Sequence, residues 1–265
     1  MGQKAPEALA QSQFQEGAAE QVCQDSAGVG KAALYELLSQ EASLEEQRER
    51  NRRLGETALQ RIQPRARLTK ARTVDGRALL VIDDALDERV LSELFACLET
   101  DAFNRTEFAR PDTREYRHHL VEYSVGKLSQ TPLFRVVNEL VQAFWPPAAG
   151  EQPQQAYRIY TNAVMFGDVA FTHRDACEPG HVTALVYPNP EWKHEFGGET
   201  VFYFETGEIA DAVAPCPGRI CLFEGDIQHR GSPPSRMFWG SRYTTAFKFA
   251  PDRPPPTARP REGPT

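Results

Sequence analysis

The 265-residue chain lacks long apolar runs, long basic tracts and closely spaced cysteine pairs. No stretch approaches the roughly 18 apolar residues of a membrane span, and MGQKAPEALAQSQFQ has no apolar core, so we expect neither a span nor a secretory signal. The formal charge is −7 at pH 7 and basic residues are dispersed, which makes nucleic acid a poor partner. The five cysteines are scattered without a Cys-x-x-Cys pair, as is typical of reduced thiols in a cytoplasmic protein.

Changes in composition divide the chain into three parts. Residues 1–68 are predicted to hold a mobile N-terminus and a helical extension. This extension contains two predicted helices, one over residues 31–40 and a second that begins at the capping-box residue Ser43. Residues 69–250 have the mixture of apolar and polar runs expected of one compact domain, and residues 251–265 are a proline-rich tail that we expect to be disordered.

Within residues 69–250 the sequence changes from helix-like to strand-like near Tyr157. Before that point, two helices are predicted from the apolar spacing of DERVLSELFACLET and from Thr131 ahead of Pro132. After it come five short β-branched and aromatic runs separated by turn residues: YRIYTNAVMF, HVTALVY, ETVFYF, RICLFEG and RYTTAFKFA. Short strands with turn signals between them, preceded by helices, indicate an α+β, mainly β, fold built on a sandwich, a jelly roll or a barrel.

His173 and Asp175 stand two residues apart in the run FTHRDACEPGH. If this run is extended, both side chains point to the same side of the backbone. A second imidazole follows the predicted strand 219–224, at His229 in FEGDIQHRGSP. Two neutral imidazoles and one carboxylate on one face make the facial triad of non-haem Fe(II) oxygenases, which leaves positions for a co-substrate and O₂. The three residues are therefore candidate metal ligands, with an ordinary surface His-Arg-Asp triplet as the competing interpretation.

Arg242 is the candidate anchor for an anionic co-substrate. In the predicted strand RYTTAFKF, Arg242 and Thr244 alternate onto one face. An arginine inside a small barrel is unfavourable without an anionic partner, and the distal carboxylate of 2-oxoglutarate is such a partner. Thr183 and Tyr187 share a face of the predicted strand HVTALVY and could bind the same carboxylate. The competing interpretation makes Arg242 a surface residue of an edge strand.

The segment 157–249 resembles the prolyl 4-hydroxylase-like branch of the Fe(II)/2-oxoglutarate-dependent dioxygenases. The matching stretches are HRD, VTALVYPNPEWKHEFGGETVFY, PGRICLFEGDIQHR and RYTTAFKF, and LLVIDDALDERVLSELF is similar to the start of such catalytic domains. The resemblance implies a double-stranded β-helix (jelly roll) core with flanking helices and an N-terminal helical extension, in which residues 69–250 form the dioxygenase domain. It also implies that the cofactors are Fe(II), 2-oxoglutarate and O₂, with ascorbate as an optional reductant. The residues that match the family's ligands are His173, Asp175 and His229 for iron, and Arg242 and Tyr187 for the 2-oxoglutarate tail.

The sequence departs from this family pattern in two places. The stretch GSPPSRMFWG before Arg242 is longer than usual, so an enlarged turn is expected and Arg236 is a rival for the carboxylate role. A tyrosine that often precedes the first iron-binding histidine is missing, and Phe166 stands nearest to its place. The corresponding contact with the co-substrate is therefore expected from Asn162 or Tyr160.

These features predict an enzyme that hydroxylates an unactivated C–H bond and releases succinate and CO₂. A small-molecule or amino-acid-like substrate is expected because no peptide-binding module is recognisable, and a peptidyl prolyl hydroxylase is the alternative. Two further alternatives are a cupin-type metal enzyme, which needs the triad but not Arg242 and Tyr187, and a non-catalytic jelly roll that binds a carboxylate. His118 and His119 are expected to be half-exposed strand residues, with a wall of the substrate pocket as the alternative. The substrate and the oligomeric state stay open.

Overall fold

The computed structural model describes residues 31–147 and 152–251, with side chains from residue 43 onward. The predicted mobile segment 1–30 and the predicted tail beyond Pro251 lie outside the described residues. The chain divides into two units, residues 1–50 and 51–265, and helix α2 (Lys31–Ile62) runs from the first into the second. None of the helices in the described part of the chain combines the length and hydrophobicity that a membrane span requires.

Helix α2 is one continuous helix, so the prediction of two separate helices was wrong. Ser43, expected to cap the second helix, lies inside α2. A serine in a helix interior costs only about 0.5 kcal/mol relative to alanine. Its neighbours Ala42 and Leu44 are strong helix formers, so no residue there ends the helix that was predicted over residues 31–40. Helix α2 stops at Ile62, just before Pro64, as expected because the residue before a proline disfavours the helical conformation.

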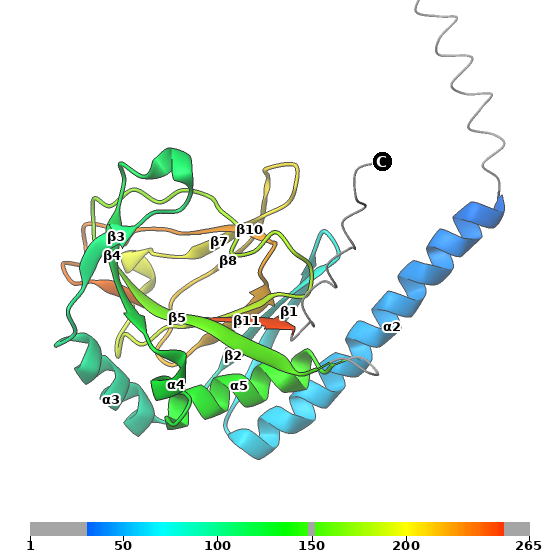
Figure 1. The fold of residues 1–265 in the computed structure, drawn as a ribbon, viewed down its shortest axis with the longest axis horizontal. Coiled ribbons are helices and arrows are strands. Elements are labelled where there is room, and N and C mark those ends of the chain that lie inside the picture. The colour runs from blue at the N-terminus through cyan, green and yellow to red at the C-terminus, as the bar shows by residue number, and fades with distance from the viewer. Residues whose placement is uncertain (1–30, 148–151, 252–265) are drawn as a thin grey trace, which may run out of the picture. The chain divides into compact units, whose positions relative to one another are not determined.

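Among the described residues, the second unit is built around two antiparallel sheets (Figure 1). The main sheet has the order β1–β2–β9–β6–β11–β5–β4–β3, and the smaller sheet has the order β10–β7–β8. The main-sheet strands are β1 (Arg67–Val74), β2 (Arg77–Asp83), β3 (Asn104–Glu107), β4 (His118–Tyr123), β5 (Gln154–Val164), β6 (Val182–Val186), β9 (Ile220–Glu224) and β11 (Arg242–Pro251). The smaller sheet contains β7 (Thr200–Tyr203), β8 (Ile209–Val213) and β10 (Gln228–Gly231). Strands distant in the sequence thus become neighbours, as in a jelly roll, and the predicted fold class is confirmed.

Side chains alternate between two buried faces of the main sheet. On one face, Leu80 and Phe247 pack in a core with helix α5 (Pro132–Phe144), which lies below the sheet in Figure 1. On the other face, Leu79 and Ala246 pack in a core with Phe202 of the smaller sheet. The second face is the inside of the jelly roll, and it carries the candidate site residues of β6 and β11.

The helices predicted ahead of the strand-rich region are confirmed as α3 (Glu88–Leu98) and α5. Thr131 caps α5 by accepting a hydrogen bond from the Phe134 N–H at 3.2 Å, and Pro132 takes the first helical position, where its missing N–H has no consequence. A short helix, α4 (Val125–Leu128), precedes this cap.

The C-terminal turns of α2 pack on α5 within the second unit. Leu59 is 1% exposed and belongs to the core that covers the outer face of the main sheet. Gly55 lies against the Phe144 ring, where an added Cβ would come within 2.3 Å of the ring carbons. Residues 51–62 therefore contribute to the core of the second unit, while the domain boundary after residue 68 stays a prediction.

Candidate metal centre

Two backbone hydrogen bonds hold His173 and His229 directly opposite each other. The N–H of each residue donates to the carbonyl of the other at 2.9 Å, which forms an isolated antiparallel bridge. Side chains that face each other in such a bridge lie on the same side of the backbone, and the two imidazole centroids are 4.5 Å apart. Asp175 follows two residues after His173, where its N–H and that of Ala176 both donate to the Gly225 carbonyl, at 2.8 and 3.0 Å.

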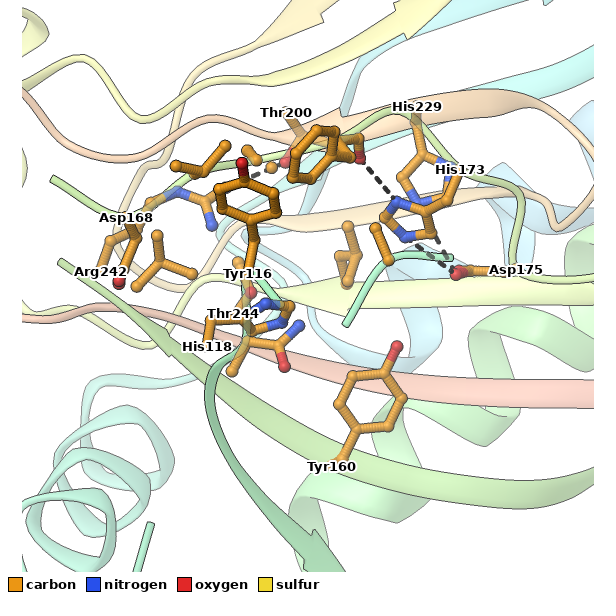
Figure 2. Close-up of a pocket in the computed structure, with 18 residues that line it drawn as sticks. Tyr116, His118, Tyr160, Asp168, His173, Asp175, Thr200, His229, Arg242 and Thr244 are labelled. Carbon is orange, nitrogen blue, oxygen red and sulfur yellow. Dashed lines mark hydrogen bonds and ion pairs between the residues drawn. The ribbon is translucent and has the colours of Figure 1, made fainter. Parts of the chain in front are cut away.

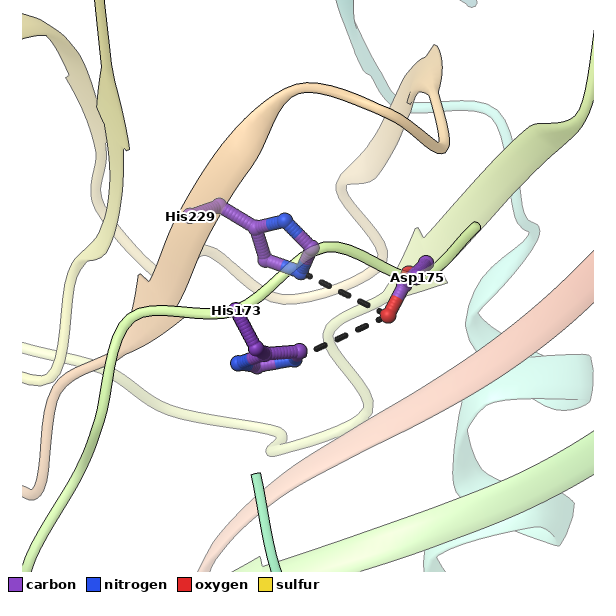
Figure 3. Close-up of side chains that lie close together, drawn as sticks. All are labelled: His173, Asp175 and His229. Atoms are coloured by element: carbon purple, nitrogen blue, oxygen red, sulfur yellow. Dashed lines mark ion pairs between the residues drawn. The ribbon is translucent and has the colours of Figure 1, made fainter. Parts of the chain in front are cut away.

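The three side chains converge on one point (Figure 3). Asp175 Oδ1 lies 3.6 Å from His173 Nε2 and 3.7 Å from His229 Nε2. The Nδ1 atoms lie 3.1 Å from the Phe171 carbonyl in His173 and 2.9 Å from the Ile227 carbonyl in His229. We assign a proton to each Nδ1, since a carbonyl can only accept. Both Nε2 lone pairs are then free to bind a metal next to the carboxylate.

The electrostatics of Asp175 and His229 match the protonation states that metal ligands require. His229 is 4% exposed, and burial lowers its pKa to about 4, so its imidazole is neutral at pH 7. Burial opposes ionisation of Asp175, but His229, Lys248 and His173 together outweigh it and hold its pKa well below the usual range. The cluster therefore presents an anionic carboxylate beside a neutral imidazole of His229, which suits a divalent cation.

The Asp175 carboxylate is held from two sides by residues of the main sheet. Thr183 Oγ1 of β6 donates to Oδ2 at 2.7 Å, and Lys248 Nζ of β11 donates to Oδ1 at 2.9 Å. The expectation that Thr183 would lie beside Arg242 is not met. Thr183 pairs with Lys248, which is six residues from Arg242 on β11, a separation of about 20 Å at roughly 3.3 Å per residue.

Arg242 is 1% exposed and lies at the far end of the same interior face. Its Nε donates to the Gly198 carbonyl and its Nη2 donates to Thr200 Oγ1 at 3.0 Å. The Tyr187 hydroxyl donates to the same threonine oxygen at 2.8 Å. Gly198 has a φ of +80°, and a Cβ there would come within 2.9 Å of Arg242 Cδ, so a glycine lets the guanidinium fit. The structure thus brings Tyr187 and Arg242 together around Thr200.

One cavity connects the triad with Arg242 (Figure 2). Thr244 and Thr200 line it near the guanidinium, and Tyr160 lines it near the triad. Asn162 and His118 also line the wall of this cavity. The sequence interpretation had offered Asn162 as a co-substrate contact and His118 as a possible wall of the substrate pocket. Apolar atoms come from residues such as Tyr116, Val169 and Phe171.

The structure also places the rival arginine and two residues that the sequence interpretation missed. Arg236 is exposed in the loop before β11. Thr200 could have been predicted from β7, because it lies two residues from Phe202 and therefore shares the interior face with it. Lys248 could have been found from β11, where it continues the series of Arg242 and Thr244. A lysine near a strand end ordinarily indicates a solvated position, which hides this signal.

Comparison with known proteins identifies the fold and the segment that carries the site. A sequence model of the 2OG-Fe(II) oxygenase superfamily matches residues 161–249, which include the triad and Arg242. A prolyl hydroxylase from Trichoplax adhaerens, in complex with a hypoxia inducible factor oxygen degradation domain peptide fragment, is similar in structure. Its TM-score is 0.54 at 16% identity, over 77% of this chain and 92% of that one.

A second similar structure is the non-haem α-ketoglutarate-dependent epimerase SnoN from nogalamycin biosynthesis. Its TM-score is 0.50 at 14% identity, over 82% of this chain and 92% of that one. At such identities the likeness establishes the fold alone. No curated protein is significantly similar to the chain in sequence.

Proposed function

We propose that the chain is a dioxygenase that hydroxylates an unactivated C–H bond and releases succinate and CO₂, because residues 161–249 match the model of the 2OG-Fe(II) oxygenase superfamily. The superfamily consists of oxidoreductases that use Fe(II), 2-oxoglutarate and O₂, so the predicted family, enzyme class and these cofactors are confirmed at that level. The proposed substrate is a small molecule or an amino-acid-like compound.

The residues of the triad fit an Fe(II) ion. His173, Asp175 and His229 contribute two imidazole nitrogens and one carboxylate oxygen, all within 4.8 Å of one another. This donor set suits non-haem Fe(II) and leaves coordination positions for other ligands. When bound, the iron would activate O₂ and supply the oxidising power, which no side chain of the cavity has.

The buried guanidinium of Arg242 is the observation that carries the proposal. Within the described residues its guanidinium donates to a carbonyl and to a hydroxyl, both neutral, so neither provides a negative charge. A fully buried cation without an ion-pair partner is strongly unfavourable. A carboxylate in the cavity would supply the missing charge in a bidentate geometry. The tail of 2-oxoglutarate has this chemistry, whereas a cupin-type enzyme that uses only the triad would leave Arg242 unexplained.

The remaining residues have positioning roles in this proposal. Thr200 and Tyr187 orient Arg242, and Thr244 adds a hydroxyl near the bound tail. The Asn162 Oδ1 is buried in the cavity wall, where it can accept a hydrogen bond from a donor group of the substrate or co-substrate. Apolar side chains, including that of Phe171, surround the space where an unactivated C–H bond would lie.

Succinate formation from 2-oxoglutarate by the full chain with Fe(II) tests the proposal. We expect slow turnover alone and faster turnover with one member of a panel of free amino acids, small carboxylic acids and proline-containing peptides. Stimulation by a peptide alone would favour the peptidyl prolyl hydroxylase. His229→Ala is the control, and it should abolish turnover. No succinate under any condition would refute the enzymatic proposal and favour a non-catalytic carboxylate-binding protein.

We also propose a cytoplasmic location. The four cysteines in the described part of the chain, Cys97, Cys177, Cys216 and Cys221, are free thiols. Reduced thiols are typical of cytoplasmic proteins. Alkylation of the intact purified protein with and without a reductant checks this, and equal labelling is expected.

A further inference from the structure

Lys248 is a buried cation that touches the candidate metal centre from outside the triad. Its residue is 7% exposed, and its Nζ donates to Asp175 Oδ1 at 2.9 Å. This Oδ1 is the same oxygen that lies 3.6 and 3.7 Å from the two imidazole Nε2 atoms. The ammonium therefore binds the carboxylate oxygen that a metal would use.

The surroundings of Lys248 keep its charge close to Asp175. Its Nζ lies 5.3 Å from the centroid of the Tyr160 ring, and the Arg158 Cζ lies 4.4 Å from the same centroid. Arg158 is balanced by its own carboxylates, Glu107 and Glu122, at 3.1 and 3.2 Å. Asp175 is the carboxylate with which Lys248 forms an ion pair.

The charges predict opposite effects of Lys248 on the metal-free and metal-bound protein. Without a metal, Lys248 balances the Asp175 carboxylate, whose side chain is 4% exposed and would otherwise be a buried unpaired charge. With a divalent cation at the usual oxygen distance of about 2.1 Å from Oδ1, the ammonium would lie within about 5 Å of that cation. Two like charges at this distance in a buried site repel each other strongly.

We propose that Lys248 is a positioning residue that acts as the fixed counter-cation of the metal site: it holds the Asp175 carboxylate in place before the metal arrives, and it weakens divalent metal binding. The inference rests on the metal site of the proposed function and deepens it. Lys248 gives the buried Asp175 carboxylate a counter-charge before a metal binds.

Titration of Co(II) chloride into the full metal-free chain, followed by visible absorption and calorimetry, tests the inference. Lys248→Leu removes the charge without offering a new metal ligand, and it should bind Co(II) at least ten times more tightly. Lys248→Arg keeps the charge and should stay within threefold of the unmodified chain. The matched control is Lys70→Leu, which breaks a Lys–Asp pair with Asp211 at the edge of the main sheet. It should leave Co(II) binding unchanged.

Thermal unfolding without metal gives a second readout that does not depend on Co(II) affinity. Lys248→Leu should lower Tm more than Lys70→Leu, because it leaves a buried carboxylate unpaired. The double variant Lys248→Leu with Asp175→Asn removes both charges and should recover most of the lost Tm. If Lys248→Leu folds only when Co(II) is present, that outcome supports the inference as well.

Failure of the proposed metal site and failure of the role proposed for Lys248 give different results. If the unmodified chain binds no Co(II), the proposed metal site itself is refuted, and the inference with it. If the unmodified chain binds Co(II) but Lys248→Leu binds it equally or more weakly, this inference alone is overturned. Lack of any Tm recovery in the double variant would also overturn it, because Lys248 would then stabilise the fold by packing and not by charge.

Discussion

Replacement of Arg242 by glutamine tests how the cavity holds a dicarboxylate. Burial lowers the pKa of Arg242, against smaller effects of Tyr187 and Glu199, so an added negative charge would be favourable beside it. A charge-assisted hydrogen bond contributes about 1.5–3 kcal/mol. At about 1.4 kcal/mol for each tenfold change, Arg242→Gln should weaken 2-oxoglutarate binding about ten- to a hundredfold.

Metal binding should change little in the same variant. Arg242 lies six residues along β11 from Lys248, the residue that contacts Asp175, so its loss leaves the triad and its supports in place. Arg236→Gln is the matched control, since it removes the same charge from an exposed position in the preceding loop. It should change 2-oxoglutarate affinity less than about threefold, as expected of a solvated charge.

Titration of 2-oxoglutarate into the anaerobic Fe(II) protein, followed by the metal-to-ligand charge-transfer absorption, measures both variants. If Arg236→Gln is damaging and Arg242→Gln is mild, the loop before β11 folds inward and the assigned anchor is wrong. If neither substitution matters, the co-substrate is not a dicarboxylate held at this end of the cavity, and the cupin-type alternative gains support.

Three further predictions concern the supports of the site and the fold. Gly198→Ala should weaken 2-oxoglutarate at least tenfold in the same titration, because a Cβ there clashes with the buried guanidinium, whereas Gly207→Ala, with a similar φ of +86° and open space, should not. Asp83→Asn should lower the free energy of urea unfolding by about 1–2 kcal/mol at pH 7, since Asp83 accepts two bonds from Arg219, at 2.6 and 2.9 Å. Burial raises the pKa of Asp83, but Arg219 lowers it by more, so the net shift is downward. The stabilisation by the Asp83–Arg219 pair is therefore present above about pH 4 and should shrink as the pH falls below it. An unchanged difference in unfolding free energy between Asp83→Asn and the unmodified chain at pH 3 would contradict the assignment. A chain that starts at residue 51 should keep the free energy of unfolding of the second unit. A chain that starts at residue 69 should lose about 2–5 kcal/mol of this free energy, because the buried Leu59 is removed.

Alternation along β11 made Arg242 predictable as an interior residue. Arg242 and Thr244 are 1% and 4% exposed, on the face that the two-residue period assigns to them. The pairing of His173 with Asp175 was predictable for the same reason, because residues two apart on an extended chain share a side. Local periodicity thus determined the direction in which these side chains point.

Periodicity could not determine whether an interior residue lies at the Asp175 end or at the Arg242 end of the jelly-roll cavity. Thr183 and Tyr187 share a face of the β6 segment, yet Thr183 binds Asp175 and Tyr187 binds Thr200 beside Arg242. Four residues of strand separate them by about 13 Å. Their partners depend on the register of β6 with β11, which is set by contacts across the sheet and not by the residues between them.

The sequence by itself determined the positions of the strand-rich segments and the three side chains that converge as a possible metal site, and the family resemblance narrowed the strand-rich class to a jelly roll. These depend on local periods of two and on residue types whose chemistry is specific. The tertiary structure alone decided that Thr200 orients the buried arginine and that Lys248 reaches the Asp175 carboxylate. Both contacts join strands far apart in the chain, and their energies depend on burial, which arises only when the two sheets close over the cavity.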